Sequence, residues 1–190
     1  MHSRHHITGL AAGAALIAVM AAPAAAQQPA YPAPQSMSAA APAEHHMMKP
    51  SKGLAQLTAL VGDWDGQTPD GKAVHLSYQV VSGGSAVLER LQMGAEPEML
   101  TVYSPDGDRV AVTHFCSAGN QPQMSTGPVT TDVKQLSFMF VRATNLATPG
   151  EGHMHNLTIK FVDPTHITQE WTWSENGQTR TMPFQFTKKS

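Results

Sequence analysis

The chain has 190 residues, a formal net charge of −2 at pH 7 and a single cysteine. The small net charge and the scattering of its 12 Lys and Arg residues argue against a nucleic-acid-binding surface. A single cysteine excludes an intrachain disulfide, so the stability of the fold must come from packing.

The N-terminal residues 1–26 have the pattern of a secretory signal peptide. A weakly basic start that includes Arg4 precedes an apolar run over residues 7–22, and small residues follow up to Ala26. The apolar run is shorter than the roughly 20 residues of a spanning helix, which weakens the alternative of a membrane anchor. This order of basic, apolar and small residues is typical of a leader cleaved after Ala26. We therefore expect an exported protein, periplasmic or secreted, with no integral membrane span after cleavage.

Residues 27–50 consist mainly of Ala, Pro, Gln, Ser and Met and have almost no periodic apolar pattern. Such a segment cannot bury enough surface to offset its ordering entropy, so it is predicted to be a disordered linker. Residues 44–49 read Glu-His-His-Met-Met-Lys, and paired His and Met suit copper. We favour the simpler interpretation of a compositionally biased tail. Residues 51–190 are then long enough for one domain with a hydrophobic core.

Residues 54–61 carry apolar side chains at helical spacing and predict one or two helical turns that end at Gly62. Beyond this point, segments rich in Val, Thr, Phe, Tyr and Trp alternate with turn residues. The predicted strands are residues 62–67, 73–81, 86–94, 98–104, 109–116, 121–127, 135–143, 155–162, 166–174 and 178–187.

Short loops between consecutive strands make neighbours antiparallel. Closing such an up-and-down sheet removes its exposed edges. The sequence therefore predicts an all-β fold, an up-and-down antiparallel β-barrel of about ten strands with one short helix before the first strand. A two-sheet sandwich is the alternative, but sandwiches usually need longer crossover connections than this chain offers.

The run Gly-Asp-Trp-Asp-Gly at residues 62–66 opens the first predicted strand, directly after the short helix. It resembles the opening of calycin barrels, the superfamily of lipocalins, fatty-acid-binding proteins and nitrobindin-like haem proteins. Together with residues 80–86, 101–107 and 113–122, it resembles a family of bacterial lipocalin-like domains of unassigned function. The resemblance covers residues 54–187 and implies a ten-stranded barrel with an interior cavity.

Strand phase predicts which side chains face the inside of this barrel, because alternate residues of a strand point to opposite faces. On the strand 109–116, His114 and Cys116 share the face of Val110 and Val112. The same alternation predicts inward-facing side chains elsewhere in the barrel, namely Tyr78, Glu89, His153, His155, Gln169, Trp171 and Trp173. A buried carboxylate is costly unless it is paired or neutral, so we expect Glu89 to pair with Arg180 or Arg142.

Three interpretations of His114, Cys116, His153 and His155 remain open. In the first, which we favour, they form the polar end of a ligand cavity whose apolar wall includes Tyr78, Trp171 and Trp173. In the second, they bind a transition metal, zinc or copper, and haem is a further candidate cofactor. In the third, they are hydrogen-bonded core residues.

The turn that follows Cys116 carries Asn120 and Gln121, which either bond the backbone of their own loop or face the barrel mouth beside His114. An enzyme would use Cys116 as nucleophile with His114 or His155 as base, but no third group orients that pair. Our prediction is an exported barrel that binds a small hydrophobic or amphipathic molecule, and we favour this binding role over the enzyme alternative.

Overall fold

The structure is a computed structural model that describes residues 51–190. The predicted signal peptide and linker, residues 1–26 and 27–50, lie outside the described residues. The elements of the described part are α1 (Lys52–Thr58), β1 (Gly62–Gln67), β2 (Ala73–Val81), a short 3-10 turn (Ser82–Gly84), β3 (Ala86–Met93), β4 (Met99–Asp106), β5 (Arg109–Phe115), β6 (Gln121–Ser125), β7 (Gln135–Thr144), β8 (His153–Asp163), β9 (His166–Glu175) and β10 (Gln178–Lys188).

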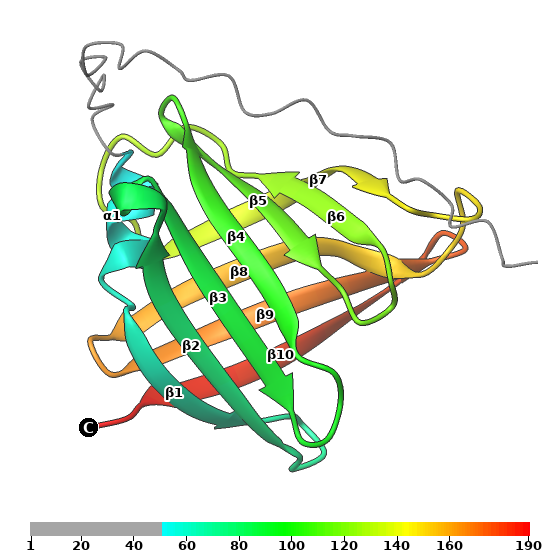
Figure 1. The fold of residues 1–190 in the computed structure, drawn as a ribbon, viewed down its shortest axis with the longest axis horizontal. Helices are drawn as coiled ribbons and strands as arrows, with labels where there is room; N and C mark the ends of the chain where they lie inside the picture. Colours follow the sequence, from blue (N-terminus) through cyan, green and yellow to red (C-terminus); the bar gives the residue numbers. More distant parts are fainter. Residues whose placement is uncertain (1–50) are drawn as a thin grey trace, which may run out of the picture. The chain divides into compact units, whose positions relative to one another are not determined.

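The ten strands form a closed barrel in which each strand pairs antiparallel with the next (Figure 1). The barrel closes where β10 pairs with β1, in a register that places Trp64 opposite Lys188. This confirms the predicted closed antiparallel barrel with one short helix before the first strand. Among the described residues, none of the helices has the length and apolar character needed to cross a bilayer.

Strand β1 shows why its sequence requires a tryptophan between two glycines. The Trp64 side chain is fully buried, and its indole nitrogen donates to the carbonyl oxygen of Leu60 across 2.8 Å. A Cβ atom at Gly66 would clash with the carbonyl oxygen of Gln185 and lie 2.6 Å from the Phe186 ring. The missing side chain at Gly66 therefore lets β1 and β10 approach and close the barrel.

Helix α1 covers one end of the barrel (Figure 1). The side-chain oxygen of Ser51 caps the helix by accepting from the backbone N–H of Leu54 at 3.2 Å. Leu54 and Leu57 are buried, and a Cβ added at Gly53 would lie only 2.7 Å from a Val110 methyl group. The helix thus packs closely against β5 and closes this end with apolar side chains.

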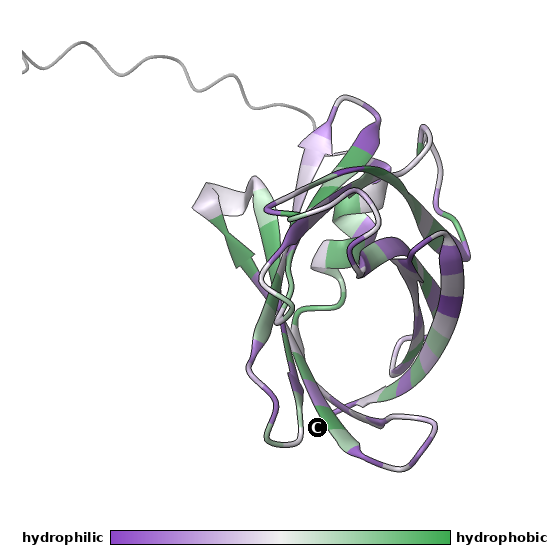
Figure 2. Ribbon diagram, turned by 90° about the vertical axis from the view of Figure 1, so that its right-hand side faces the viewer, coloured by the Kyte–Doolittle hydropathy of each residue, from purple (hydrophilic) through white to green (hydrophobic). Residues whose placement is uncertain are grey.

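The strands alternate between buried and exposed residues, which Figure 2 shows as alternating hydrophobic and hydrophilic colours along the ribbons. Three register shifts interrupt the regular pairing of the strands: one between Gln123 and Met124, where β6 pairs with β7, and two where β8 pairs with β9, between Met154 and Asn156 and between Phe161 and Asp163. The shift between Met154 and Asn156 leaves His155 as an extra residue without a partner on β9. The alternation of inward-facing and outward-facing residues before His155 is therefore offset by one residue from the alternation after it.

Candidate ligand-binding site

A pocket of about 560 Å³ opens at the end of the barrel that carries the β1–β2 and β3–β4 connections. This volume falls within the range of roughly 300–1,000 Å³ typical of small-molecule sites. Its lining residues are Thr68, Pro69, Asp70, Lys72, Leu91, Met93, Met99, His114, Met154, Trp171, Arg180, Thr181, Met182, Pro183 and Phe184.

The pocket wall is mostly apolar and contains four methionines, Met93, Met99, Met154 and Met182. Methionine side chains are flexible and polarizable, so they fit apolar ligands of different shapes. Met154 lies in this wall because of the bulge in β8, which places it directly opposite Trp173 on β9. The wall is therefore deformable at several positions around the lumen.

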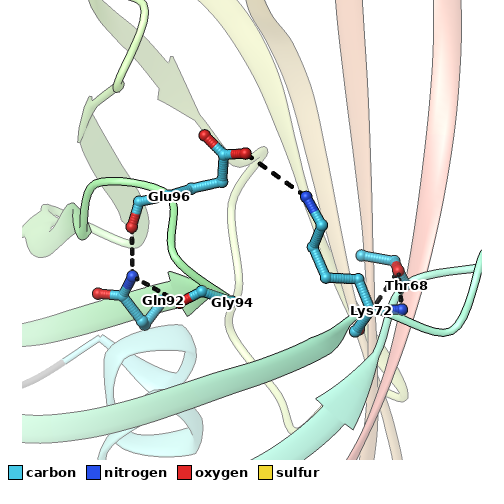
Figure 3. A network of polar contacts seen from close by, with 5 residues as sticks. All are labelled: Thr68, Lys72, Gln92, Gly94 and Glu96. Carbon is cyan, nitrogen blue, oxygen red and sulfur yellow. Dashed lines mark hydrogen bonds and ion pairs between the residues drawn. The ribbon is translucent and has the colours of Figure 1, made fainter.

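Polar contacts at the mouth connect two loops (Figure 3). The ammonium group of Lys72 lies 3.5 Å from a carboxylate oxygen of Glu96, and both side chains are about half exposed. The side-chain amide of Gln92 donates to the carbonyl oxygens of Gly94 and Glu96, and the Lys72 backbone N–H donates to the Thr68 hydroxyl at 2.8 Å. These contacts join the β1–β2 turn to the β3–β4 loop beside the pocket.

Arg180 supplies a second positive charge at the mouth. Within residues 51–190 its guanidinium group forms no ion pair, and its hydrogen bond runs to the sulfur of Met182 at 3.7 Å. Asp70 also lines the mouth, where hydrogen bonds led by the Thr68 hydroxyl lower the pKa of its carboxyl group. The free guanidinium group makes Arg180 the side chain best able to bind an anionic group of a ligand.

A hydrogen-bonded network surrounds Glu89, whose side chain is fully buried. Its Oε2 atom accepts from the Tyr103 hydroxyl and from the side-chain amide of Gln169, each at 2.7 Å. Its Oε1 atom lies 3.4 Å from the Thr101 hydroxyl. Burial raises the pKa of Glu89, and the hydrogen bonds from these neighbours oppose that rise.

Two tyrosines complete this network. The Tyr78 hydroxyl accepts a second hydrogen bond from the Gln169 amide at 2.7 Å. Burial, followed by the charge of Glu89, raises the pKa of both Tyr78 and Tyr103 well above the usual value. Both phenols therefore stay protonated and available as hydrogen-bond donors.

His114 connects the network to the pocket. Its Nδ1 atom lies 3.0 Å from the Thr101 hydroxyl, and its ring centroid lies 4.7 Å from that of Trp171. Its Nε2 atom is buried and has no hydrogen-bond partner within the described chain, although His114 belongs to the pocket wall. Burial lowers the pKa of His114 to about 4, so the imidazole is neutral at pH 7.

The expected ion pair of Glu89 is wrong. Arg180 lies at the mouth of the pocket, and Arg142 is exposed and donates to Gln123 at 2.8 Å. The carboxyl group of Glu89 instead receives hydrogen bonds from Tyr103, Gln169 and Thr101. Neutral donors satisfy the buried oxygens without burying a second charge.

His153 and His155, which were also predicted to face the ligand cavity, do not line this pocket. Strands β7 and β8 pair only as far as Phe138 opposite Leu157, and the two histidines pack beyond that point. His155 stacks on Phe140 with centroids 4.4 Å apart, and His153 lies 5.0 Å from the same ring. The bulge at His155 is the physical reason for this placement, since it breaks the alternation of inward-facing and outward-facing residues along β8.

Trp173, Cys116, Asn120 and Gln121, which were also predicted to bind the ligand, do not line this pocket. Trp173 packs over Gly152, where no side chain intervenes. Cys116 follows the end of β5, and burial raises the pKa of its thiol, which disfavours the nucleophilic thiolate. The Asn120 amide donates to the carbonyl oxygen of Gly152 at 2.9 Å, and the Gln121 amide donates to that of Gly119 at 3.1 Å.

The predicted metal set of His114, Cys116, His153 and His155 is not brought together. Between Ser51 and Ser190, no three His, Cys, Asp or Glu side chains are grouped so that they could hold a metal ion. His114 lies in the pocket wall, whereas His153 and His155 pack with Phe140 at the seam between β7 and β8. Haem as a cofactor stays a prediction.

The site also contains residues that strand phase did not single out. Thr101 and Tyr103 occupy alternate positions of β4, on the face of Met99, and both are buried. Gln169 faces inward as predicted from strand phase, and it is fully buried next to Glu89. The sequence does contain a signal for these partners. Thr101, Tyr103 and Gln169 are polar residues at inward-facing strand positions, and a buried carboxylate such as Glu89 needs hydrogen-bond donors of this kind.

Comparisons with known proteins give a weak likeness. No protein-family model and no curated protein matches the chain. A solved protein of unknown function from the DUF3598 family of Nostoc punctiforme PCC 73102 is similar at a TM-score of 0.39 and 11% identity, over 71% of this chain and 49% of that protein. The chain thus spans about half the length of that protein. A redesigned β-barrel is similar at a TM-score of 0.36 and 10% identity, over 70% of this chain and 95% of that one. The resemblance to lipocalin-like domains stays a prediction.

Proposed function

We propose that the barrel binds a small amphipathic molecule in the pocket at its open end. One observation carries this proposal: an apolar pocket of about 560 Å³ has a buried imidazole nitrogen at its inner end and the Arg180 guanidinium group at its mouth. Among residues 51–190, the imidazole nitrogen has no hydrogen-bond partner, and the guanidinium group has no partner apart from the Met182 sulfur. Mostly apolar cavities with a few convergent polar groups are the usual design of small-molecule sites.

The division of the pocket into an apolar wall and a cationic mouth defines the ligand. An apolar chain or ring would contact Leu91, the methionines and Phe184. An anionic group would lie at the mouth beside Arg180 and Lys72. A medium-chain carboxylic acid such as dodecanoic acid has both features and serves as the probe.

The test compares binding of dodecanoic acid by calorimetry to the wild-type protein and to two tryptophan variants. Met182→Trp adds bulk inside the pocket, while Met139→Trp makes the same chemical change on the outer face, where Met139 is 59% exposed. We expect the first change to weaken binding at least tenfold and the second to leave it within about twofold. Failure of the wild-type protein to bind, or equal binding by all three proteins, would refute the proposal.

Arg180 gives a second test with a matched pair of ligands. Arg180→Gln removes the charge and should weaken dodecanoic acid about tenfold, because a charge-assisted hydrogen bond is lost. Binding of 1-dodecanol, which has no charge, should change little. Equal losses for both ligands would contradict an anionic group at the mouth.

We also propose that the protein is exported, with a mature chain that begins at Gln27. The apolar run over residues 7–22 and the small residues up to Ala26 support this. N-terminal sequencing of the protein from fractionated bacterial cells tests it. A chain that retains residues 1–26 in the cytoplasmic fraction would refute it.

A further inference from the structure

The orientation of the Gln169 side-chain amide beside Glu89 follows from its hydrogen bond with Trp171. An indole N–H can only donate, and it donates to the side-chain oxygen of Gln169 at 2.8 Å. The amide nitrogen of Gln169 must therefore face away from Trp171, toward Tyr78 and Glu89. Both of its hydrogens are used, one on the Tyr78 hydroxyl and one on Oε2 of Glu89.

The two carboxylate oxygens of Glu89 consequently differ in their roles. Oε2 lies 2.7 Å from the Gln169 amide nitrogen, which can only donate, and from the Tyr103 hydroxyl, so on an ionised Glu89 it accepts from both. Oε1 lies 3.4 Å from the Thr101 hydroxyl. On an ionised Glu89, Oε1 is therefore the acceptor that the Thr101 hydroxyl meets.

Thr101 couples the protonation state of Glu89 to the tautomer of His114. Its hydroxyl group has one proton and can donate it either to Glu89 or to His114, but not to both. When Glu89 is ionised, the hydroxyl donates to Oε1 and accepts from Nδ1–H of His114, 3.0 Å away. A neutral imidazole carries one N–H, so its Nε2 atom is then a bare acceptor. When Oε1 is replaced by a donor, the hydroxyl donates to Nδ1 instead and Nε2 carries the hydrogen.

The Nε2 atom is where this chain of hydrogen bonds reaches the ligand pocket. It is buried at the pocket wall next to Trp171, and no group of residues 51–190 forms a hydrogen bond with it. Met99 lies two residues from Thr101 on the same face of β4, and its flexible side chain can move to admit a ligand group. A ligand that satisfies Nε2 removes the cost of an unpaired buried polar group.

We propose that the pocket selects a ligand whose inner end carries a hydrogen-bond donor, such as a hydroxyl group, because Glu89 and Thr101 hold His114 in the tautomer that exposes Nε2 as an acceptor. This rests on the proposed function and specifies its ligand. The ligand is an amphipathic molecule with an anionic group at Arg180 and a donor at His114. Glu89 touches no ligand and acts as a positioning residue.

The test uses three acids that differ only at the inner end: 12-hydroxydodecanoic acid, 12-methoxydodecanoic acid and dodecanoic acid. The hydroxyl group donates, the ether can only accept, and the third acid does neither. We expect the wild-type protein to bind the hydroxy acid about tenfold more tightly than the methoxy acid, as for one hydrogen bond to a buried partner.

Glu89→Gln should reverse this preference. The oxygen of the introduced amide would remain with Tyr103 and Gln169, so the amide nitrogen would donate to Thr101, and Nε2 of His114 would become a donor. The methoxy acid should then bind more tightly than the hydroxy acid. Because the same two ligands are compared in both proteins, the size of the methyl group does not affect this comparison. Thr101→Val removes the hydroxyl that links Glu89 to His114. In that background, Glu89→Gln should leave the ratio of the two binding affinities unaltered.

Long-range ¹⁵N–¹H NMR of the histidine ring shows which nitrogen of His114 carries the hydrogen, and it needs neither a ligand nor a variant. We expect wild-type His114 to carry its hydrogen on Nδ1 at pH 7. A hydrogen on Nε2, or equal binding of all three acids, would overturn the inference and leave the proposed function intact. If none of the three acids binds, the proposed function fails as well.

Discussion

The indole nitrogen of Trp171 donates to the side-chain oxygen of Gln169 across 2.8 Å, and this bond joins the pocket wall to the buried carboxyl group of Glu89. Trp171 lines the pocket, whereas Gln169 is fully buried behind it. The pocket wall and the polar interior are thus parts of one hydrogen-bonded unit. A change at the wall should therefore affect both stability and ligand preference.

Trp171→Phe is expected to lower the free energy of unfolding by about 1–3 kcal/mol more than Trp173→Phe does. The first change leaves the buried oxygen of Gln169 without a donor. The second removes an indole N–H that makes no hydrogen bond within the described chain, so it serves as the control. Urea unfolding of both variants measures the difference, and equal losses would show that this hydrogen bond contributes little.

The stability of the protein should depend on pH through His114. Burial lowers the pKa of its imidazole from 6.5 to about 4. As the pH falls through 6.5, the unfolded chain takes up a proton that the folded protein excludes, so the contribution present at pH 7 is lost progressively toward pH 4. His114→Gln should reduce the loss of stability between pH 7 and pH 4.5 by about 2 kcal/mol.

The groups that face His114 are Thr101 from β4 and Trp171 from β9, with Glu89 beyond Thr101. Burial raises the pKa of Glu89, so its effect on stability has the opposite pH dependence. Its contribution to the free energy of unfolding is present below about pH 4.5 and is lost as the pH rises above that value. Glu89 is present in both proteins, so the comparison isolates His114. The same pH dependence in the wild type and in His114→Gln would contradict the account.

Gly66→Ala should weaken the closure of the barrel between β1 and β10. The added methyl group would meet the carbonyl oxygen of Gln185 and the ring of Phe186, and we expect a loss of about 1–3 kcal/mol. Gly127→Ala is the matched control, because no atom lies within 4 Å of its added carbon. Thermal unfolding measures both, and an unchanged midpoint for Gly66→Ala would be evidence against this contact.

The stack of Phe140 on His155 should stabilise the seam where β7 and β8 stop pairing. Phe140→Ala is expected to lower the unfolding free energy by about 2 kcal/mol, since a half-buried aromatic contact is lost. The affinity for dodecanoic acid should stay within about twofold, because Phe140 is outside the pocket wall. A large loss of affinity with full stability would instead assign this cluster to the binding site.

Alternation along the strands was sufficient to predict the barrel and part of its site. It placed Glu89, His114 and Trp171 inside, and the structure confirms these positions. A period of two holds as long as a strand stays regular, which is true of β3, β5 and β9 at these residues.

The remaining site residues depend on features that alternation does not contain. His155 lies in a bulge, and Cys116 lies one residue beyond the end of β5. The partners of Glu89 come from strands far apart in sequence, since Gln169 is 80 residues away from it. The register between strands determines which side chains meet across the barrel. The alternation of residues within one strand does not contain this information.

A crystal structure of the protein with 12-hydroxydodecanoic acid would show whether the ligand binds between Arg180 and His114. We expect the hydrocarbon chain inside the pocket, with the carboxylate beside Arg180 and the hydroxyl oxygen within hydrogen-bond distance of Nε2 of His114. A ligand bound on the outer surface, or one whose carboxylate points inward to His114, would refute the proposed binding mode.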